Sequence, residues 1–443
     1  MRYSRVLLCV LLLLACAASA QQVASGNSTD TSALEQKIRD LEDRLVMLEG
    51  QVRQLKAQGA AAPSQNAAAP AAPASASQVS VTPQGASGYT ASAGDNVRLG
   101  GAGGSAAKAL NPDVSVIGDF IGAAGHNPLN PTPSFQMHES EIGLQAIIDP
   151  YARGDFFISF SETGVNLEEG YITFTALPKG FVARGGKMRA AFGKVNTLHN
   201  HVLPWVDRPL VTQNLVGGED GIDDAGFSVE HIITAPRNWF LDFTGQTFRG
   251  DSSDVYTSSS KNDLSVVGHL RGYHDLTDNS NLDLGLSYSR GHNLFGSDFI
   301  TSLYGIDATY HWKPLQRSIY KSFIARSEFI WRRQDQPTLA VCQNIACPLN
   351  FAPGNQHAFG FYASGDFQFA RRWFVGARVD RSDRAFNSHI DDKGGSVVLT
   401  YWPSEFAQIR GQYRFTRYAD QFDANEAFIQ LQFALGAHGA HPF

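Results

Sequence analysis

Hydrophobic and polar side chains alternate one by one along most of the chain after residue 113. This period of two indicates β-strands, in which successive side chains point to opposite faces. The clearest stretch lies near the C-terminal end, where the apolar positions are Ala427, Ile429, Leu431, Phe433 and Leu435. Many such stretches are longer than an average strand of about five or six residues. Strands of about ten residues with one apolar and one polar face are typical of transmembrane β-barrels.

The alternation predicts sixteen strands, and bacterial single-chain barrels have an even number. The predicted strands are residues 113–122, 134–148, 153–162, 168–177, 181–192, 225–234, 239–249, 263–275, 281–292, 299–313, 319–334, 357–370, 373–381, 394–402, 405–418 and 425–436. Every second connection is a short turn, and the others are mostly longer, as expected of periplasmic turns opposite outer loops. The tryptophans beside the short turns suit a membrane–water interface; they are Trp239, Trp312, Trp373 and Trp402. Residues 110–443 are therefore predicted to form a 16-stranded antiparallel transmembrane β-barrel.

The first twenty residues are predicted to be a secretory signal peptide. Arg2 and Arg5 precede an apolar run, and Ala18-Ser19-Ala20 offers a small-residue cleavage site. A lipoprotein site at Cys16 is the alternative. After residue 20 no apolar run reaches the roughly 18–20 residues that a membrane-spanning helix needs.

Residues 31–56 are predicted to form a short α-helical coiled coil, because apolar residues recur there at heptad spacing. They are Leu34, Ile38, Leu41, Leu45, Leu48, Val52 and Leu55. Lys37 can pair with Glu42 of a neighbouring helix, which favours self-association over an amphipathic helix packed on its own protein. The pattern leaves dimer and trimer open. Residues 57–109 are rich in Ala, Pro, Ser and Gly and are expected to be a flexible linker.

Composition narrows the function. The formal charge is −6 and charged residues make up 18% of the chain, so nucleic-acid binding is not expected. Cys342 and Cys347 are expected to form a small disulfide, since two thiols alone make a poor zinc site. The chain has no G-x-S-x-G, P-loop or H-E-x-x-H motif, so we expect neither an enzyme nor a cofactor.

The order of signal peptide, heptad helix, Ala/Pro linker and sixteen strands resembles the phosphate-selective group of outer-membrane porins and their coiled-coil-bearing relatives. The segment 185–194, with a Gly-Lys start and a Phe-Gly end, resembles a recurring strand of these porins. The resemblance covers residues 31–56 and 110–443. It implies a homotrimer surrounded by outer-membrane lipid, with the coiled coil in the periplasm, that passes small hydrophilic or anionic solutes by diffusion. Porins of this group tend to end in an aromatic residue, for which Phe443 and Phe433 are the alternatives.

In sixteen-stranded porins the connection between strands five and six folds inward and narrows the pore. Here that connection is 193–224, and its acidic residues are Glu219, Asp220, Asp223 and Asp224. The strand period places five arginines on the lumen face: Arg326, Arg332, Arg378, Arg410 and Arg414. An acidic loop facing an arginine wall would create a field that selects ions. Lumen-facing carboxylates such as Glu139, Glu141 and Asp155 would dilute it, and the alternative is that all these charges are simply solvated.

His199 and His201, with Asp207 nearby, are weak candidates for a metal site, because two histidines at this spacing can share a metal ion. This leaves two alternatives to a diffusion porin. One is a barrel for metal or siderophore uptake. The other is a structural tether that uses the heptad helix to anchor the outer membrane.

Overall fold

The computed structural model describes residues 112–162, 164–235, 239–252, 254–338 and 351–436. The predicted signal peptide, coiled coil, linker and Cys342–Cys347 disulfide lie outside the described residues and stay predictions. All described residues belong to the unit Pro83–Phe443. In this part of the chain no helix is both long and apolar enough to cross a membrane.

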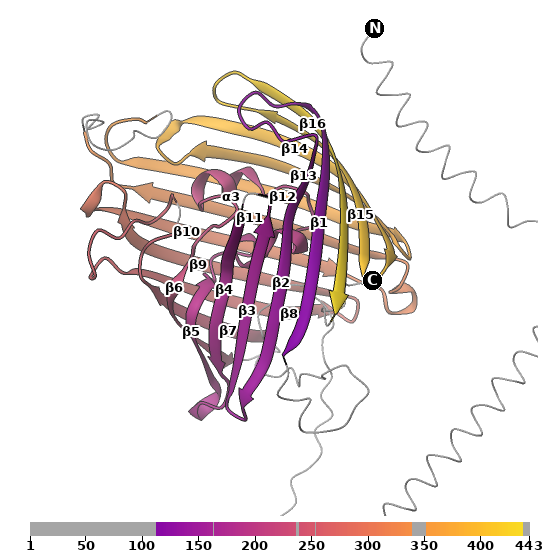
Figure 1. The fold of residues 1–443 in the computed structure, drawn as a ribbon, viewed down its shortest axis with the longest axis horizontal. Coiled ribbons are helices and arrows are strands. Elements are labelled where there is room, and N and C mark those ends of the chain that lie inside the picture. The colour runs from indigo at the N-terminus through magenta and orange to yellow at the C-terminus, as the bar shows by residue number, and fades with distance from the viewer. Residues whose placement is uncertain (1–111, 163, 236–238, 253, 339–350, 437–443) are drawn as a thin grey trace, which may run out of the picture. The chain divides into compact units, whose positions relative to one another are not determined.

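Sixteen antiparallel strands close into one barrel (Figure 1). Each strand pairs with its neighbours in sequence, and β1 closes the ring against β16 with Ser115 opposite Gly436. The predicted fold is thereby confirmed. The strands are β1 Asp113–His126, β2 Phe135–Asp149, β3 Ala152–Ser161, β4 Gly164–Phe174, β5 Phe181–Arg189, β6 Asp223–Thr234, β7 Trp239–Phe248, β8 Ser265–Thr277, β9 Ser280–Asn293, β10 Gly296–Trp312, β11 Ser322–Gln334, β12 Gln356–Ala370, β13 Trp373–Arg384, β14 Asn387–Ser404, β15 Ala407–Arg417 and β16 Asp423–Gly436.

The connections alternate less regularly than predicted. Short turns at 150–151, 278–279 and 371–372 mark one end of the barrel, here called the turn end. At the opposite end, 190–222 and 335–355 are long, but β13 and β14 join through residues 385–386 alone. The sequence pattern predicts a start of β14 at residue 394, whereas the strand begins at Asn387. In the structure the polar residues before 394 continue the ladder, where Asp392 pairs with Arg384 across the two strands.

The two faces of the barrel wall differ as the alternation predicted. Apolar residues such as Leu286, Val397 and Ile429 are exposed on the outside, and glutamines such as Gln412 and Gln430 are buried inside. An apolar outer band around a polar interior is the arrangement of membrane barrels. One aromatic prediction is wrong. Trp402 faces inward and is buried, because it follows Val398 and Thr400 on the inner face of β14.

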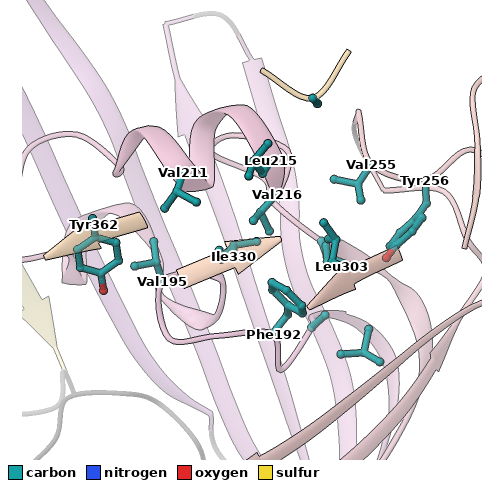
Figure 2. Close-up of a cluster of buried hydrophobic side chains, with 14 of the residues drawn as sticks. Phe192, Val195, Val211, Leu215, Val216, Val255, Tyr256, Leu303, Ile330 and Tyr362 are labelled. Atoms are coloured by element: carbon teal, nitrogen blue, oxygen red, sulfur yellow. The ribbon is translucent and has the colours of Figure 1, made fainter. Parts of the chain in front are cut away.

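The long connection between β5 and β6 lies inside the barrel. It contains η2 Val195–Thr197, η3 Asn200–Val202 and the short helix α3 Leu210–Leu215. Val211, Leu215 and Val216 join a buried apolar cluster with Leu303 of β10 and other wall residues (Figure 2). The helix approaches β12 closely at Gly360, where a Cβ would lie 2.8 Å from Cγ2 of Val211. Apolar packing therefore fixes one part of this connection to the β10–β13 wall.

Candidate pore constriction

Residues 190–222, here called the constriction loop, cross the lumen and contact opposite walls. Lys194 pairs with Asp283 of β9 at 2.6 Å. Asn214 donates a hydrogen bond to Asp392 of β14, and Gln432 of β16 donates one to the carbonyl oxygen of His201. His199 contacts Glu141 of β2. The connection that was expected to fold inward therefore lies inside the barrel.

On the β13–β15 side, Asp207 connects the loop to two arginines. Its carboxylate accepts hydrogen bonds from Arg378 at 2.8 Å and from Arg414 at 2.9 Å, and Gln412 donates a third. The ring of Trp205 lies 4.8 Å from the Arg378 guanidinium. Burial alone would raise the pKa of Asp207, but the charges of the two arginines outweigh it and hold the pKa far below its usual value. This carboxylate is therefore charged at neutral pH and ties the loop to β13 and β15.

All five predicted arginines lie on the inner face, but none of them forms an ion pair with the predicted acidic cluster. Besides Arg378 and Arg414, Arg326 pairs with Asp366 of β12, and Arg410 donates to Thr400 and Gln430. Arg332 donates to the carbonyl oxygens of Leu215 and Asp254. The five arginines thus pack against the wall and the loop instead of forming a bare ladder.

The four acidic residues predicted to face the arginines pair with other groups, line a cavity or belong to β6. Asp223 and Asp224 begin β6 and do not belong to the loop; Asp223 pairs with Lys187 at 2.8 Å. Glu219 lies 3.4 Å from His138 of β2, and this contact lowers the pKa of the Glu219 carboxyl. Asp220, Asp223 and Asp224 line a cavity of about 300 Å³ together with Lys187, Arg249 and Asp251. Among the described residues, the acidic cluster forms no ion pairs with the five arginines, and three of its carboxylates have nearer cations: Glu219 contacts His138, Asp223 pairs with Lys187 and Asp224 pairs with Arg249.

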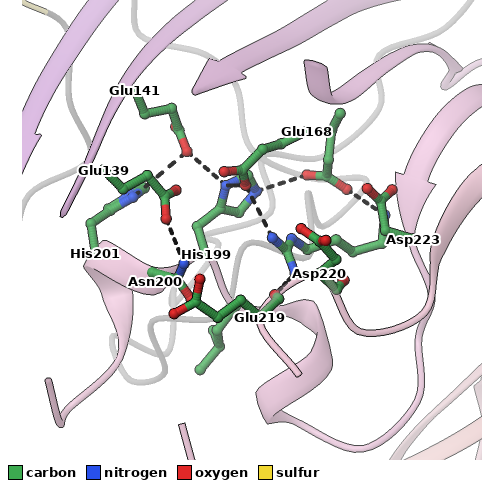
Figure 3. Close-up of polar contacts among 12 residues, drawn as sticks. Glu139, Glu141, Glu168, His199, Asn200, His201, Glu219, Asp220 and Asp223 are labelled. Atoms are coloured by element: carbon green, nitrogen blue, oxygen red, sulfur yellow. Dashed lines mark hydrogen bonds and ion pairs between the residues drawn. The ribbon is translucent and has the colours of Figure 1, made fainter. Parts of the chain in front are cut away.

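On the β2–β4 side, the loop inserts a histidine among carboxylates (Figure 3). Nδ1 of His199 lies 2.7 Å from Glu141 and 2.9 Å from Glu168, and its Nε2 lies 3.0 Å from Glu169. Burial would lower the pKa of His199, but these carboxylates raise it well above the usual value. Asp207 does not take part, so the expected grouping of Asp207 with the two histidines is wrong; Asp207 belongs to the arginine side.

In four ion pairs of the lumen, between the loop and the turn end, the cationic side chain is more exposed than the carboxylate. The side chains of Arg153, Arg271 and Lys194 are 25–27% exposed, whereas their partners Asp155 and Asp283 are 3–5% exposed. Arg326 and Asp366 show the same order, at 26% and 15%. The accessible surface of these pairs is therefore cationic. Sequence reasoning missed Arg153, Arg271 and Lys194, although the strand period would have placed the first two on the inner face.

No protein-family model matches the chain. An uncharacterized protein of Aquifex aeolicus (strain VF5) is 28% identical in an alignment of 398 positions that covers 76% of this chain and 81% of that protein. Among solved structures, Salmonella typhi OmpF in complex with daunomycin shares the fold with a TM-score of 0.50, at 10% identity, over 74% of this chain and 98% of that one. An anion-selective porin from Comamonas acidovorans aligns with a TM-score of 0.49, at 9% identity, over 73% of this chain and 99% of that one. The likeness to the first of these structures agrees with a closed sixteen-stranded barrel.

Proposed function

We propose that the chain forms an outer-membrane channel through which small hydrophilic solutes, anions in preference to cations, diffuse passively. The observation that carries the proposal is the exposure of Arg153, Arg271, Arg326 and Lys194 above more deeply buried carboxylates. A solute that enters from the turn end meets guanidinium and ammonium groups first. Such clusters of fixed charge select permeating ions.

The location follows from the apolar outer band, which needs lipid around it. Self-association is the finer part of the proposal and rests on the heptad repeat of residues 31–56. Three copies, not two, rest on the resemblance to the phosphate-selective group of porins. With an N-terminal strand that starts at the turn end, this coiled coil would lie in the periplasm.

A general preference for anions fits the lumen better than a site for phosphate. Each exposed lumen cation has a carboxylate partner, so the lumen offers no run of unpaired arginines among these residues. A multivalent phosphate ion would have to displace these carboxylates to bind tightly. We therefore expect phosphate to permeate without blocking the chloride current at low millimolar concentration.

The test is the reversal potential of the purified full chain in planar bilayers under a KCl gradient. We expect a potential of the sign for chloride preference, and a smaller one for Arg271→Gln. The matched control is Arg417→Gln, whose side chain is exposed outside this part of the lumen and which should behave as the wild type. A potential of the sign for potassium preference would contradict the proposal. Folded protein without conductance would favour the tether or the uptake barrel instead.

A further inference from the structure

Where the constriction loop contacts β2 and β4, histidines and carboxylates form a cluster that the passage of anions does not require. Glu141, His199 and His201 are buried and bring one ligand atom each within 4.8 Å of one another. Glu139, Glu141 and Glu168 form a second such group, which shares Glu141 with the first. The second group lies on β2 and β4 alone, whereas the first takes its two histidines from the loop and therefore forms only when the loop is docked.

We propose that Glu141, Glu168, His199 and His201 form a binding site for a divalent transition-metal ion of the zinc type, which fastens the constriction loop to β2 and β4. Imidazole nitrogens and carboxylate oxygens are ligands that zinc uses in proteins. This site does not depend on the solute that the channel passes.

The distances are close to those of a metal site. Nδ1 of His199 lies 2.7 Å from Glu141 and 2.9 Å from Glu168, and Nδ1 of His201 lies 3.6 Å from Glu141. With metal–ligand bonds of about 2.0–2.2 Å, ligand atoms of a tetrahedral site lie about 3.3–3.6 Å apart. Small side-chain shifts therefore suffice to place an ion between these atoms.

Glu169 supplies the outer contact that metal-bound histidines usually have. Its carboxylate lies 3.0 Å from Nε2 of His199. When this nitrogen carries the proton, Nδ1 presents its lone pair to Glu141 and Glu168. A histidine that binds a metal almost always donates its other N–H to such a partner, which fixes the tautomer.

The charges also favour a cation at this position. Four carboxylates gather here, those of Glu139, Glu141, Glu168 and Glu169, and Arg189 pairs with Glu168 at 3.1 Å. Arg208 gives its hydrogen bonds to Asn200 and to carbonyl oxygens of the loop. One oxygen of Glu139 is buried without a backbone, amide or guanidinium donor among the described residues, and the other accepts a hydrogen bond from Asn200. Buried carboxylates need compensating cations; Arg189 and His199 face them in this structure, and a divalent ion bound between His199 and the carboxylates would compensate them more strongly.

The experiment measures metal binding by the full chain, folded in detergent and free of any affinity tag. Zn²⁺ is counted by elemental analysis after dialysis, and Co²⁺ is titrated while the visible absorption of tetrahedral cobalt is recorded. We expect about one tightly bound Zn²⁺ per chain and intense tetrahedral cobalt bands. Folding of each variant is checked by the heat-dependent shift in electrophoretic mobility that folded barrels show.

Three variants test the site: one removes a proposed ligand, one removes the outer contact and one is the control. We expect His201→Gln to lose the cobalt bands, and Glu169→Gln to weaken Zn²⁺ binding by about 10–100-fold, as loss of an outer partner typically does. The matched control is His269→Gln, an inner-wall histidine hydrogen-bonded to Ser287 and away from the cluster, which should bind as the wild type. If His201→Gln does not fold, Glu169→Gln alone still tests the site. The proposal is overturned if the wild type retains no Zn²⁺, or if folded His201→Gln and Glu169→Gln bind it as tightly as the control.

Discussion

The constriction loop meets two walls of opposite character. On the β13–β15 side the wall supplies arginines and the loop supplies one carboxylate, Asp207. On the β2–β4 side the wall supplies carboxylates and the loop supplies His199. On the first side, two arginines that also pair with wall carboxylates face the loop carboxylate, whereas on the second side several wall carboxylates face His199 and Arg189. The arginine side therefore holds the loop through fixed charges of its own, while the proposed metal ion would add a cation on the acidic side.

The largest effect should come from breaking the arginine anchor with Asp207→Asn. The change leaves Arg378 and Arg414 without their shared loop partner, and breaking a buried ion pair costs about 3–5 kcal/mol. We expect a larger and noisier single-channel conductance, because the loop is released from this wall. Asp423→Asn, which removes an exposed pair with Arg417, is the control. Conductance equal to that of the wild type would show that Asp207 does not hold the loop.

A slightly smaller effect should follow from weakening the apolar contact between the two anchors. Leu215 of α3 is fully buried against the wall, and replacing such a leucine by alanine typically costs about 2–5 kcal/mol. Leu215→Ala should therefore make the loop more sensitive to protease while the barrel stays folded. Leu286→Ala, on the lipid-facing surface of β9, is the control for a leucine lost outside the lumen. Equal protease sensitivity of the two variants would count against the packing described for α3.

Arg271→Gln should weaken the anion preference of the lumen without moving the loop, because Lys194 still pairs with Asp283. A unit charge about 4 Å from a passing ion is worth about 1 kcal/mol in water, so its loss should weaken the passage of chloride by up to about fivefold and lower the chloride-to-potassium permeability ratio. The reversal potential measures this ratio. An unchanged ratio would mean that ions do not pass Arg271.

The smallest effect is expected from pH. Because the pKa of Asp207 is lowered below 3.8 in the folded chain, its contribution to stability is fully present above pH 3.8. That contribution is lost as the pH falls through the folded pKa. The groups that face Asp207 are Arg378, Arg414 and Gln412, and the arginines stay charged throughout. Conductance noise that arises from this anchor should therefore stay constant between pH 8 and pH 5; a rise within that range would argue against it.

Much of the barrel could be predicted from the sequence because a strand repeats every two residues. This period placed Arg378 and Arg414 on the inner face and gave the order of all sixteen strands. Local pattern could not show which loop charge meets which wall, since that depends on the path of the loop across the lumen. Asp207 was therefore grouped with His199, and Asp223 was assigned to the loop although it pairs in β6. The long polar start of β14 was missed because ion pairs across the strands replace its apolar pattern.

The most direct test of the account is a cross-link that forms only when the loop lies across the lumen. A Cβ at Gly360 would lie 2.8 Å from Cγ2 of Val211, which is close enough for the thiols of Gly360→Cys and Val211→Cys to join. If the loop lies across the lumen, the two introduced cysteines of the double variant form a disulfide under oxidising conditions and do not react with maleimide. After reduction, both react with maleimide. Val397→Cys, on the outer surface, combined with Val211→Cys should keep both thiols free. Free thiols in the folded Gly360→Cys, Val211→Cys variant would contradict a loop held inside the barrel.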